Sequence, residues 1–180
     1  MSMIKYADET EVRTTHWMMP DMANPMGNIF GGQILAMVDT IAYMCAARYA
    51  ANPQCVTAAM DRLDLHEAVH VGELLTLVAR ITRTGRSSMD VEINAYAENI
   101  ETGHVRLTHT CYLLMVSLKD GKPAEVPQLV CRTSLDKARF VHAKMRQEMQ
   151  ARYRQERDRF VDAFATMDDA QIDALVAARD

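Results

Sequence analysis

The sequence predicts an α+β fold in which a long antiparallel sheet wraps around one central helix, followed by a helical extension. Three observations carry this prediction: one apolar segment with helical spacing, three long segments that alternate between apolar and polar residues, and a charged amphipathic segment near the end. The sheet is expected to be antiparallel, because the alternating segments follow one another without the intervening helices of a βαβ pattern.

The predicted central helix spans residues 32–49, with the sequence "GQILAMVDTIAYMCAARY". Ile34, Val38 and Ile41 follow the helical period, and methionines and alanines fill much of the remaining surface. A helix that is apolar nearly all round is a buried helix. We therefore expect the sheet to enclose it.

Long strands are predicted over 74–83, 87–99 and 104–118, because apolar and polar residues alternate there with period two. The sequences "TGR", "ETGH" and "KDGK" place turn glycines between and after these strands, as in a meander. An earlier strand is predicted over 55–65, and "HEAVHVGE" connects it to the next one. Other α+β folds share this pattern, so periodicity alone does not choose among them.

The last third of the chain has a different character, and we predict a first domain over 1–128 and an amphipathic helical extension over 129–180. Its apolar residues recur at spacings of three, four or seven, which predicts a long helix. A last helix is expected to begin with a capping box from Thr166 to Asp169. Residues 137–159 hold eight Lys and Arg against three Asp and Glu, so this segment could attract an anionic ligand.

Composition limits the classes of partner and the compartment. An apolar share of 49% and a net charge of −4 are ordinary for a globular chain. The basic segment interleaves few aromatic residues, and no run of about 18 apolar residues occurs, so we expect neither a nucleic-acid nor a membrane partner. The start lacks the pattern of a secretory signal, and the four cysteines show no C-x-x-C spacing, which predicts reduced thiols and a cytoplasmic location.

The segment "HEAVH" (66–70) matches the H-E-x-x-H motif of zinc proteases, which requires both histidines on one face of a helix. The β-branched Val69 and Val71, followed by Gly72, disfavour a helix here. In an extended chain, positions four residues apart are separated by about 13 Å, at 3.3 Å per residue, which is too far to share one zinc ion. We predict no metal at this segment and no cofactor for the protein.

Asp39 is the one formal charge between Asp21 and Arg48, and it stands in an apolar segment. Gly31 and Gly32 remove side chains where the predicted helix begins, so a ligand can approach the free N–H groups at the positive end of the helix dipole. Asp39 lies two turns further on, too far to cap that end, and must be directed at something else. The alternative interpretation is a buried structural acid with a satisfied hydrogen bond.

Two stretches together resemble the hot-dog acyl-coenzyme A thioesterases of the bacterial short-chain and eukaryotic cytosolic types: "PDMANPMGNIFGGQILAMVD" and "VTAAMDRLDLHEAVHVGELLTLVARITRTGRSSMDV". The resemblance covers residues 10–146, and its most specific part is N-x-x-G-N-x-x-G-G with an acid seven residues beyond the last glycine. It implies a hot-dog fold and hydrolysis of acyl-CoA to a free carboxylic acid and coenzyme A, within fatty acid metabolism. It also implies a homodimer whose sheets join edge to edge, assembled further into a hexamer, a trimer of dimers.

The resemblance implies the site residues as well. The catalytic pair falls on Asn24 and Asp39, contributed by opposite subunits, and Asp39 would act as a general base or as a nucleophile. The thioester carbonyl would point at the amides of Gly31 and Gly32. Contacts with coenzyme A fall on two short segments and one basic side chain: Ala58, Ala59, Met60, Ser87, Ser88, Met89 and Arg146.

Two other activities stay open beside this one. A hot-dog protein could bind acyl-CoA as a sensor without turnover, but a sensor needs to keep neither Asn24 nor Asp39. A hot-dog dehydratase typically relies on a histidine near the central helix, and none occurs between His16 and His66. The predicted function is therefore an acyl-CoA thioesterase.

Overall fold

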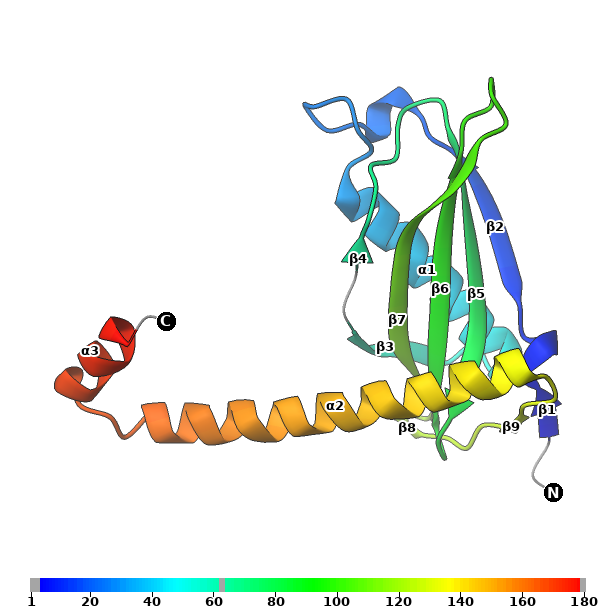
Figure 1. Cartoon of the computed structure of the whole chain (residues 1–180). Coiled ribbons are helices and arrows are strands. Elements are labelled where there is room, and N and C mark those ends of the chain that lie inside the picture. The colour runs from blue at the N-terminus through cyan, green and yellow to red at the C-terminus, as the bar shows by residue number, and fades with distance from the viewer. Residues whose placement is uncertain (1–3, 62–63, 179–180) are drawn as a thin grey trace. The chain divides into compact units, whose positions relative to one another are not determined.

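The computed structural model describes residues 4–61 and 64–178. Within them, seven strands form one antiparallel sheet in the order β2-β5-β6-β7-β3, with β4 and β8 also pairing with β7. Figure 1 shows α1 (Gly31–Ala50) running along one face of this sheet. The strands are β2 (Val12–Trp17), β3 (Cys55–Met60), β4 (Asp64–Leu65), β5 (Leu74–Thr84), β6 (Ser88–Glu98), β7 (Val105–Lys119) and β8 (Lys122–Pro123). The predicted antiparallel sheet around one central helix is confirmed.

Period-two alternation determines which face of the sheet is buried, because successive side chains of a strand point to opposite faces. The register pairs Leu77 with Ala95, and Ala95 with His109, so these three side chains share the face toward α1. The largest fully buried side chains of this face are Leu75, Leu77, Ile81, Met89, Ile93, Leu113 and Met115. The predicted strands 74–83, 87–99 and 104–118 are confirmed as β5, β6 and β7.

The central helix differs from its prediction in one respect. Its buried side is a single stripe: Ile34, Val38, Ile41, Ala42, Cys45, Ala46 and Tyr49. The opposite side, which includes Ala36, Asp39, Thr40 and Met44, is exposed in the single chain. The expected burial of this helix nearly all round was wrong for the single chain, because the sheet of one chain covers one face of the helix.

Two short strands form a separate parallel pair, β1 (Ile4–Tyr6) with β9 (Gln128–Val130). Arg132 reinforces this pairing: its guanidinium lies 4.0 Å from the centre of the Tyr6 ring and donates to the carboxylate of Asp8 at 3.0 Å. Segments this short have too few residues to show a period, so periodicity gave no indication of this parallel pair. It ties the start of the chain to the segment that leads into α2.

The chain divides into two compact units, Met1–Phe140 and Val141–Asp180. The long helix α2 (Ser134–Phe164) begins in the first unit, and α3 (Asp169–Ala177) lies in the second. The capping box of α3 is formed by Asp168 and Gln171. The predicted box from Thr166 was wrong, because the Thr166 hydroxyl donates to the carbonyl of Ala163 in the preceding turn, at 2.8 Å. In the described part of the chain, no helix is both long enough and apolar enough to cross a membrane.

Candidate active site

The first turn of α1 offers backbone donors without acceptors. Phe30 is the N-cap residue and makes no side-chain capping hydrogen bond, and its carbonyl accepts from the amide of Gln33 at 2.9 Å. The amides of Gly31 and Gly32 therefore have no acceptor among the described residues. A Cβ at Gly31 would meet nothing within 4 Å, so this glycine leaves open space in front of the helix. A helix start of this kind binds a negative or partly negative oxygen.

Asn24 organises the loop before the helix, residues 23–30, which we call the Asn24 loop. Its side-chain carbonyl accepts from the amides of Met26 at 2.9 Å and Asn28 at 3.2 Å, and its backbone amide donates to the carbonyl of Asn28 at 2.7 Å. An asparagine that bonds its own backbone in this way stabilises a tight turn. Its side-chain NH₂ group has no partner in the described part of the chain. This NH₂ group is available as a donor to a ligand.

Asp39 lies on the exposed side of α1, so the buried acid suggested by its apolar neighbours was wrong for the single chain. The hydroxyl of Thr57, on β3, donates to Asp39 Oδ1 at 2.6 Å. Thr57 Oγ1 also lies 3.4 Å from the buried sulfur of Met115. Sequence reasoning missed Thr57, although a hydroxyl residue directly before the predicted 58–60 contacts was the available signal. The pair places a fixed carboxylate at the surface.

The two parts of the predicted site are separated within one chain. Asp39 is eight residues beyond Gly31, which corresponds to about 12 Å along a helix that rises 1.5 Å per residue. No hydrogen bond joins Asn24 to Asp39 within the residues that the structure describes. The structure therefore brings Asn24 to the helix start and Thr57 to Asp39, but it does not unite the two groups.

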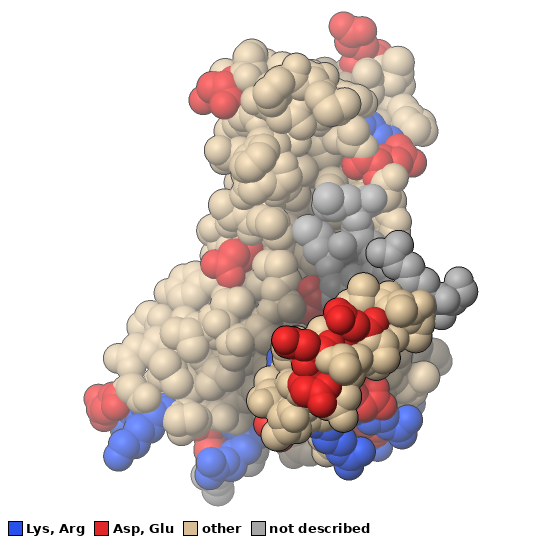
Figure 2. Space-filling model, turned by 90° about the vertical axis from the view of Figure 1, so that its left-hand side faces the viewer, with Lys and Arg blue, Asp and Glu red and all other residues tan. Residues whose placement is uncertain are grey.

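The predicted contacts with coenzyme A lie on two neighbouring parts of the sheet. Residues 58–60 end β3, an exposed edge strand with a register irregularity between Thr57 and Ala59. Residues 87–89 precede and begin β6, and the register runs from Met89 through Met115 to Thr57. Met89 is fully buried, backbone included, so the single chain does not expose it to a ligand. In the space-filling view, most of the visible surface is made of uncharged residues, and the charged side chains form small separate groups on it (Figure 2).

Arg146 lies on α2 in the second compact unit, so its contact with coenzyme A stays a prediction. The "HEAVH" segment is not helical, as expected. Among the described residues, no group of three or more His, Cys, Asp or Glu is arranged to hold a metal ion.

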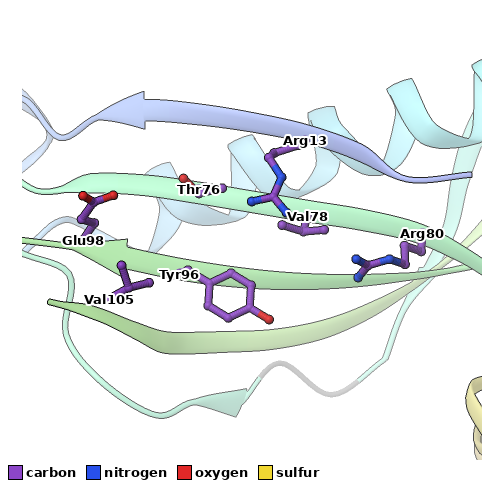
Figure 3. A pocket seen from close by; sticks show the side chains of 7 residues that line it. All are labelled: Arg13, Thr76, Val78, Arg80, Tyr96, Glu98 and Val105. Carbon is purple, nitrogen blue, oxygen red and sulfur yellow. The ribbon is translucent and has the colours of Figure 1, made fainter. Parts of the chain in front are cut away.

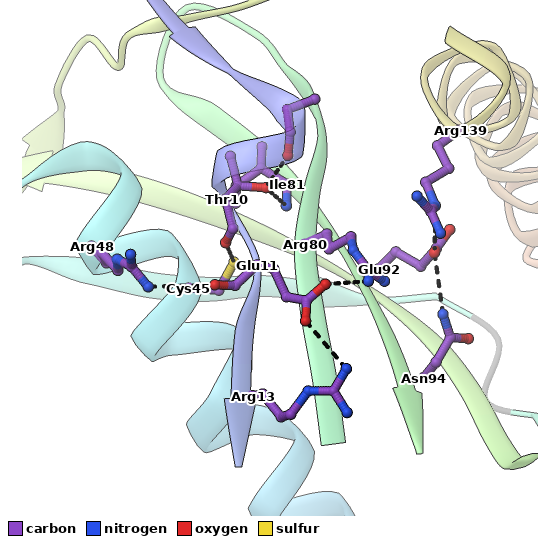
Figure 4. A network of polar contacts seen from close by, with 11 residues as sticks. Thr10, Glu11, Arg13, Cys45, Arg48, Arg80, Ile81, Glu92, Asn94 and Arg139 are labelled. Carbon is purple, nitrogen blue, oxygen red and sulfur yellow. Dashed lines mark hydrogen bonds and ion pairs between the residues drawn. The ribbon is translucent and has the colours of Figure 1, made fainter. Parts of the chain in front are cut away.

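The outer face of the sheet, away from α1, carries a different kind of surface. A shallow pocket of about 310 Å³ is lined there by Arg13, Thr76, Val78, Arg80, Tyr96, Glu98 and Val105 (Figure 3). Its arginines are already paired, since Glu11 contacts both Arg13 and Arg80 (Figure 4). Nearby, Glu92 accepts from Arg139 at 3.2 Å. None of the predicted site residues lines this pocket, which separates it from the surface around α1 and β3.

Comparisons with known proteins show which family has this sequence and fold. A family model described as the thioesterase superfamily matches residues 26–104. Protein VdlD of Helicobacter pylori is 34% identical over 83% of this chain and 85% of its own length. YkhA of Bacillus subtilis, named an uncharacterized acyl-CoA thioester hydrolase, is 32% identical over 72% of this chain and 75% of its own length. The chain belongs to the thioesterase superfamily.

Further relatives and solved structures resemble this thioesterase. The human cytosolic acyl coenzyme A thioester hydrolase is 36% identical over 63% of this chain, which corresponds to 32% of the human protein. An acyl-CoA hydrolase from Staphylococcus aureus, solved with butyryl coenzyme A, superposes with a TM-score of 0.80 at 28% identity over 91% of this chain and 99% of its own. A hexameric acyl-CoA thioesterase superposes with a TM-score of 0.81 at 33% identity over 84% of this chain and 97% of its own.

The Staphylococcus aureus hydrolase was also solved as three variants, in which an asparagine, an aspartate or a threonine is replaced by alanine. The replaced asparagine and aspartate are 15 positions apart in that protein, and Asn24 and Asp39 are 15 apart in this thioesterase. The replaced threonine lies 17 positions beyond the aspartate there, and Thr57 lies 18 beyond Asp39 here.

Proposed function

We propose that this thioesterase hydrolyses acyl-CoA to a free carboxylic acid and coenzyme A, with water activated by Asp39. The observation that carries the assignment of the base is the hydrogen bond of 2.6 Å from Thr57 to Asp39 on the exposed side of α1. The bond fixes one carboxylate oxygen and leaves the other free to accept a proton from water. The spacing of the asparagine and aspartate varied in the Staphylococcus aureus hydrolase supports the same pair of residues.

The chemistry needs a site for the charge that develops on the thioester oxygen. The free amides of Gly31 and Gly32 would donate to this oxygen, and one such donor is worth about 3–4 kcal/mol of transition-state stabilisation. The NH₂ group of Asn24 would hold the water or the carbonyl in line. Water, deprotonated by Asp39, attacks the carbonyl carbon; the C–S bond breaks, and the proton passes to the coenzyme A thiolate. A general base of this kind contributes roughly 10²–10⁴-fold.

One site would draw on two chains. A base and an oxyanion donor that act on one carbonyl must both lie within a few ångströms of it, whereas Gly31 and Asp39 of one helix are about 12 Å apart. In a two-fold dimer, the helix start and Asn24 of one subunit would meet Asp39 and Thr57 of the other. The exposed edge strand β3, with Val56 at 45% and Met60 at 41% exposure, supports the edge-to-edge joining of two sheets. We propose this dimer and, from the hexameric relative, a trimer of dimers.

Recognition of coenzyme A is assigned by the family resemblance. Residues 58–60 on the β3 edge and 87–89 at the start of β6 would contact the pantetheine and pyrophosphate arm, and Arg146 would pair with a phosphate. We propose no metal and no cofactor besides the coenzyme A of the substrate. A cytoplasmic location is proposed as well, because the human relative is named a cytosolic enzyme.

Release of free thiol from acyl-CoA tests the function. We expect steady release over many turnovers for the purified protein, undiminished by prolonged chelation. Single-turnover hydrolysis in ¹⁸O-labelled water then tests Asp39 as a nucleophile. Direct attack by water places the label in the carboxylic acid product and leaves Asp39 unlabelled, whereas a mixed anhydride that water opens at the aspartyl carbonyl places the label in Asp39 and leaves the product unlabelled. Tight binding of acyl-CoA without turnover would contradict the proposal and indicate a sensor.

A further inference from the structure

One buried ion pair lies behind the Asn24 loop. Glu73, at the end of the 66–73 segment, is 5% exposed, and the guanidinium of Arg106 on β7 engages both of its carboxylate oxygens, at 2.7 and 2.9 Å. Burial raises the pKa of Glu73, but the hydrogen bonds and charge of Arg106 outweigh it and hold the net pKa below the usual range. Glu73 is therefore ionised at neutral pH, and the pair is bidentate and charge-assisted.

The same pair fastens the whole 66–73 segment. Arg106 also donates to the carbonyl of Ala68 at 2.7 Å and contacts the carboxylate of Glu67 at 3.0 Å. Glu73 in turn accepts from the backbone amide of His70 at 2.8 Å. The segment has no regular secondary structure, and Val69 and Glu73 are its buried residues. Backbone hydrogen bonds hold the segment as well: the amide of His66 donates to the carbonyl of Thr108 at 2.9 Å, and Met18 bonds Gly72 and Glu73 at 2.8 and 2.9 Å. The Arg106–Glu73 pair adds the side-chain contacts that join residues 67, 68, 70 and 73 to one another.

The Asn24 loop is hydrogen-bonded to the 66–73 segment. The amide of Ile29 donates to the carbonyl of Val69 at 2.8 Å, and Asn28 forms an antiparallel bridge with His70. Asn28 in turn holds Asn24: its amide donates to the side-chain carbonyl of Asn24, and its own carbonyl accepts from the backbone amide of Asn24. A continuous chain of contacts thus runs from Arg106 through the 66–73 segment to the Asn24 side chain, and Gly31 follows at the end of the same loop.

We propose that the Arg106–Glu73 pair is a positioning element that sets the geometry of Asn24 and of the helix start for hydrolysis. This inference rests on the proposed function. It also assigns a role to the "HEAVH" segment, for which we propose no metal. Four of its residues take part in these contacts: Glu67, Ala68, Val69 and His70. Neither residue of the pair touches the predicted coenzyme A contacts on β3 and β6.

The test is Arg106→Gln, compared with Arg80→Gln as a matched control. Arg80, on β5 of the same sheet, forms an ion pair with Glu11, away from the Asn24 loop. Both variants are assayed for thiol release well below their unfolding temperatures. For Arg106→Gln we expect kcat to fall toward the roughly 10²-fold loss that a misplacement of about 1 Å produces, with KM unchanged. For Arg80→Gln we expect kcat within about twofold of wild type.

A double-mutant cycle separates positioning from simple destabilisation. If Arg106 acts through the Asn24 loop, adding Arg106→Gln to Asn24→Ala lowers kcat far less than it does in the wild-type background. Arg106→Lys keeps the charge but not the planar guanidinium that reaches four acceptors, so we expect it to recover only part of kcat. It replaces Arg106→Gln in the cycle if the glutamine variant fails to fold.

Losses no larger than those of Arg80→Gln, or losses that multiply with those of Asn24→Ala, would overturn the positioning role. A wild-type protein that releases no thiol would remove the proposed function and this inference together. An active wild type with an unaffected Arg106 variant removes this inference alone.

Discussion

The two faces of α1 differ in how completely one chain buries them. Toward the sheet, Val38 and Ile41 are at most 1% exposed and pack into the core. On the other face, Met44 is 41% and Tyr43 39% exposed, beside the Asp39–Thr57 pair. Burying a large apolar side chain stabilises a protein by about 1.5–3 kcal/mol, so the open face leaves such gains unused in the single chain. One chain completes the fold, whereas the proposed site needs a second.

The largest expected effect is on the open face. Asp39→Asn removes the proposed base and should lower kcat by about 10²–10⁴-fold, while the unfolding temperature stays close to that of wild type because the side chain is exposed. Thiol-release kinetics and thermal unfolding check both parts. Asp120→Asn, the same change in an exposed turn, is the control. An Asp39→Asn protein with near-normal kcat would leave the pair without a catalytic role.

Thr57→Val tests the hydroxyl that holds the carboxylate. The substitution keeps the shape and removes the hydrogen bond to Asp39, which as a bond to a charged group is worth about 1.5–3 kcal/mol. We expect kcat to fall about tenfold or more at unchanged KM. Thr15→Val, which removes a hydroxyl contact to Thr76 on the outer face, should leave kcat as it is. Equal kinetic losses in both variants would argue against a specific role for Thr57.

The two faces of α1 should also separate folding from assembly. Ile41→Ala leaves a cavity in the packed face and should lower the free energy of unfolding by about 2–5 kcal/mol. Met44→Arg places a charge on the open face and should shift the protein toward monomers, as measured by sedimentation, with little change in secondary structure. Met44→Arg protein that assembles like wild type would show that this face is not an interface.

The smallest expected effect is a pH dependence on the packed side. His109 is 3% exposed, and burial, with a smaller contribution from the charge of His66, lowers its pKa below 6.5. As the pH falls below about 6.5, the unfolded chain takes up a proton that the folded chain resists, so the free energy of unfolding decreases. His109→Gln should flatten this decrease in denaturant titrations from pH 7.5 to 5.5. An unchanged slope of unfolding free energy against pH would show that a group other than His109 causes the decrease.

Local patterns predicted the elements that one chain completes. Period two gave the long strands, and the helical period gave α1, because these signals follow from which face of an element is buried. Periodicity could not show that one side of α1 stays open, since an apolar surface looks the same whether its own sheet or another chain covers it. Thr57 gave only a weak signal, its place directly before the predicted 58–60 contacts, because a single threonine in a strand is ordinary.

The pairing of distant residues also lay beyond the sequence. Asn24 and Asp39 were found by resemblance to a family, not by spacing alone. The contact of Thr57 with Asp39, and that of Arg106 with Glu73, depend on strand register and on an irregular loop. Neither leaves a periodic trace in the chain.

The most direct test of a site shared between chains is complementation between two inactive variants. Asn24→Ala and Asp39→Ala, carrying different tags, are co-expressed and the mixed dimers isolated. By symmetry, one site of each mixed dimer then holds both wild-type residues and the other holds neither. The account predicts recovery of up to about half of the wild-type activity per dimer. Folded mixed dimers without any recovery would contradict it, because every site would then still lack one of the two residues.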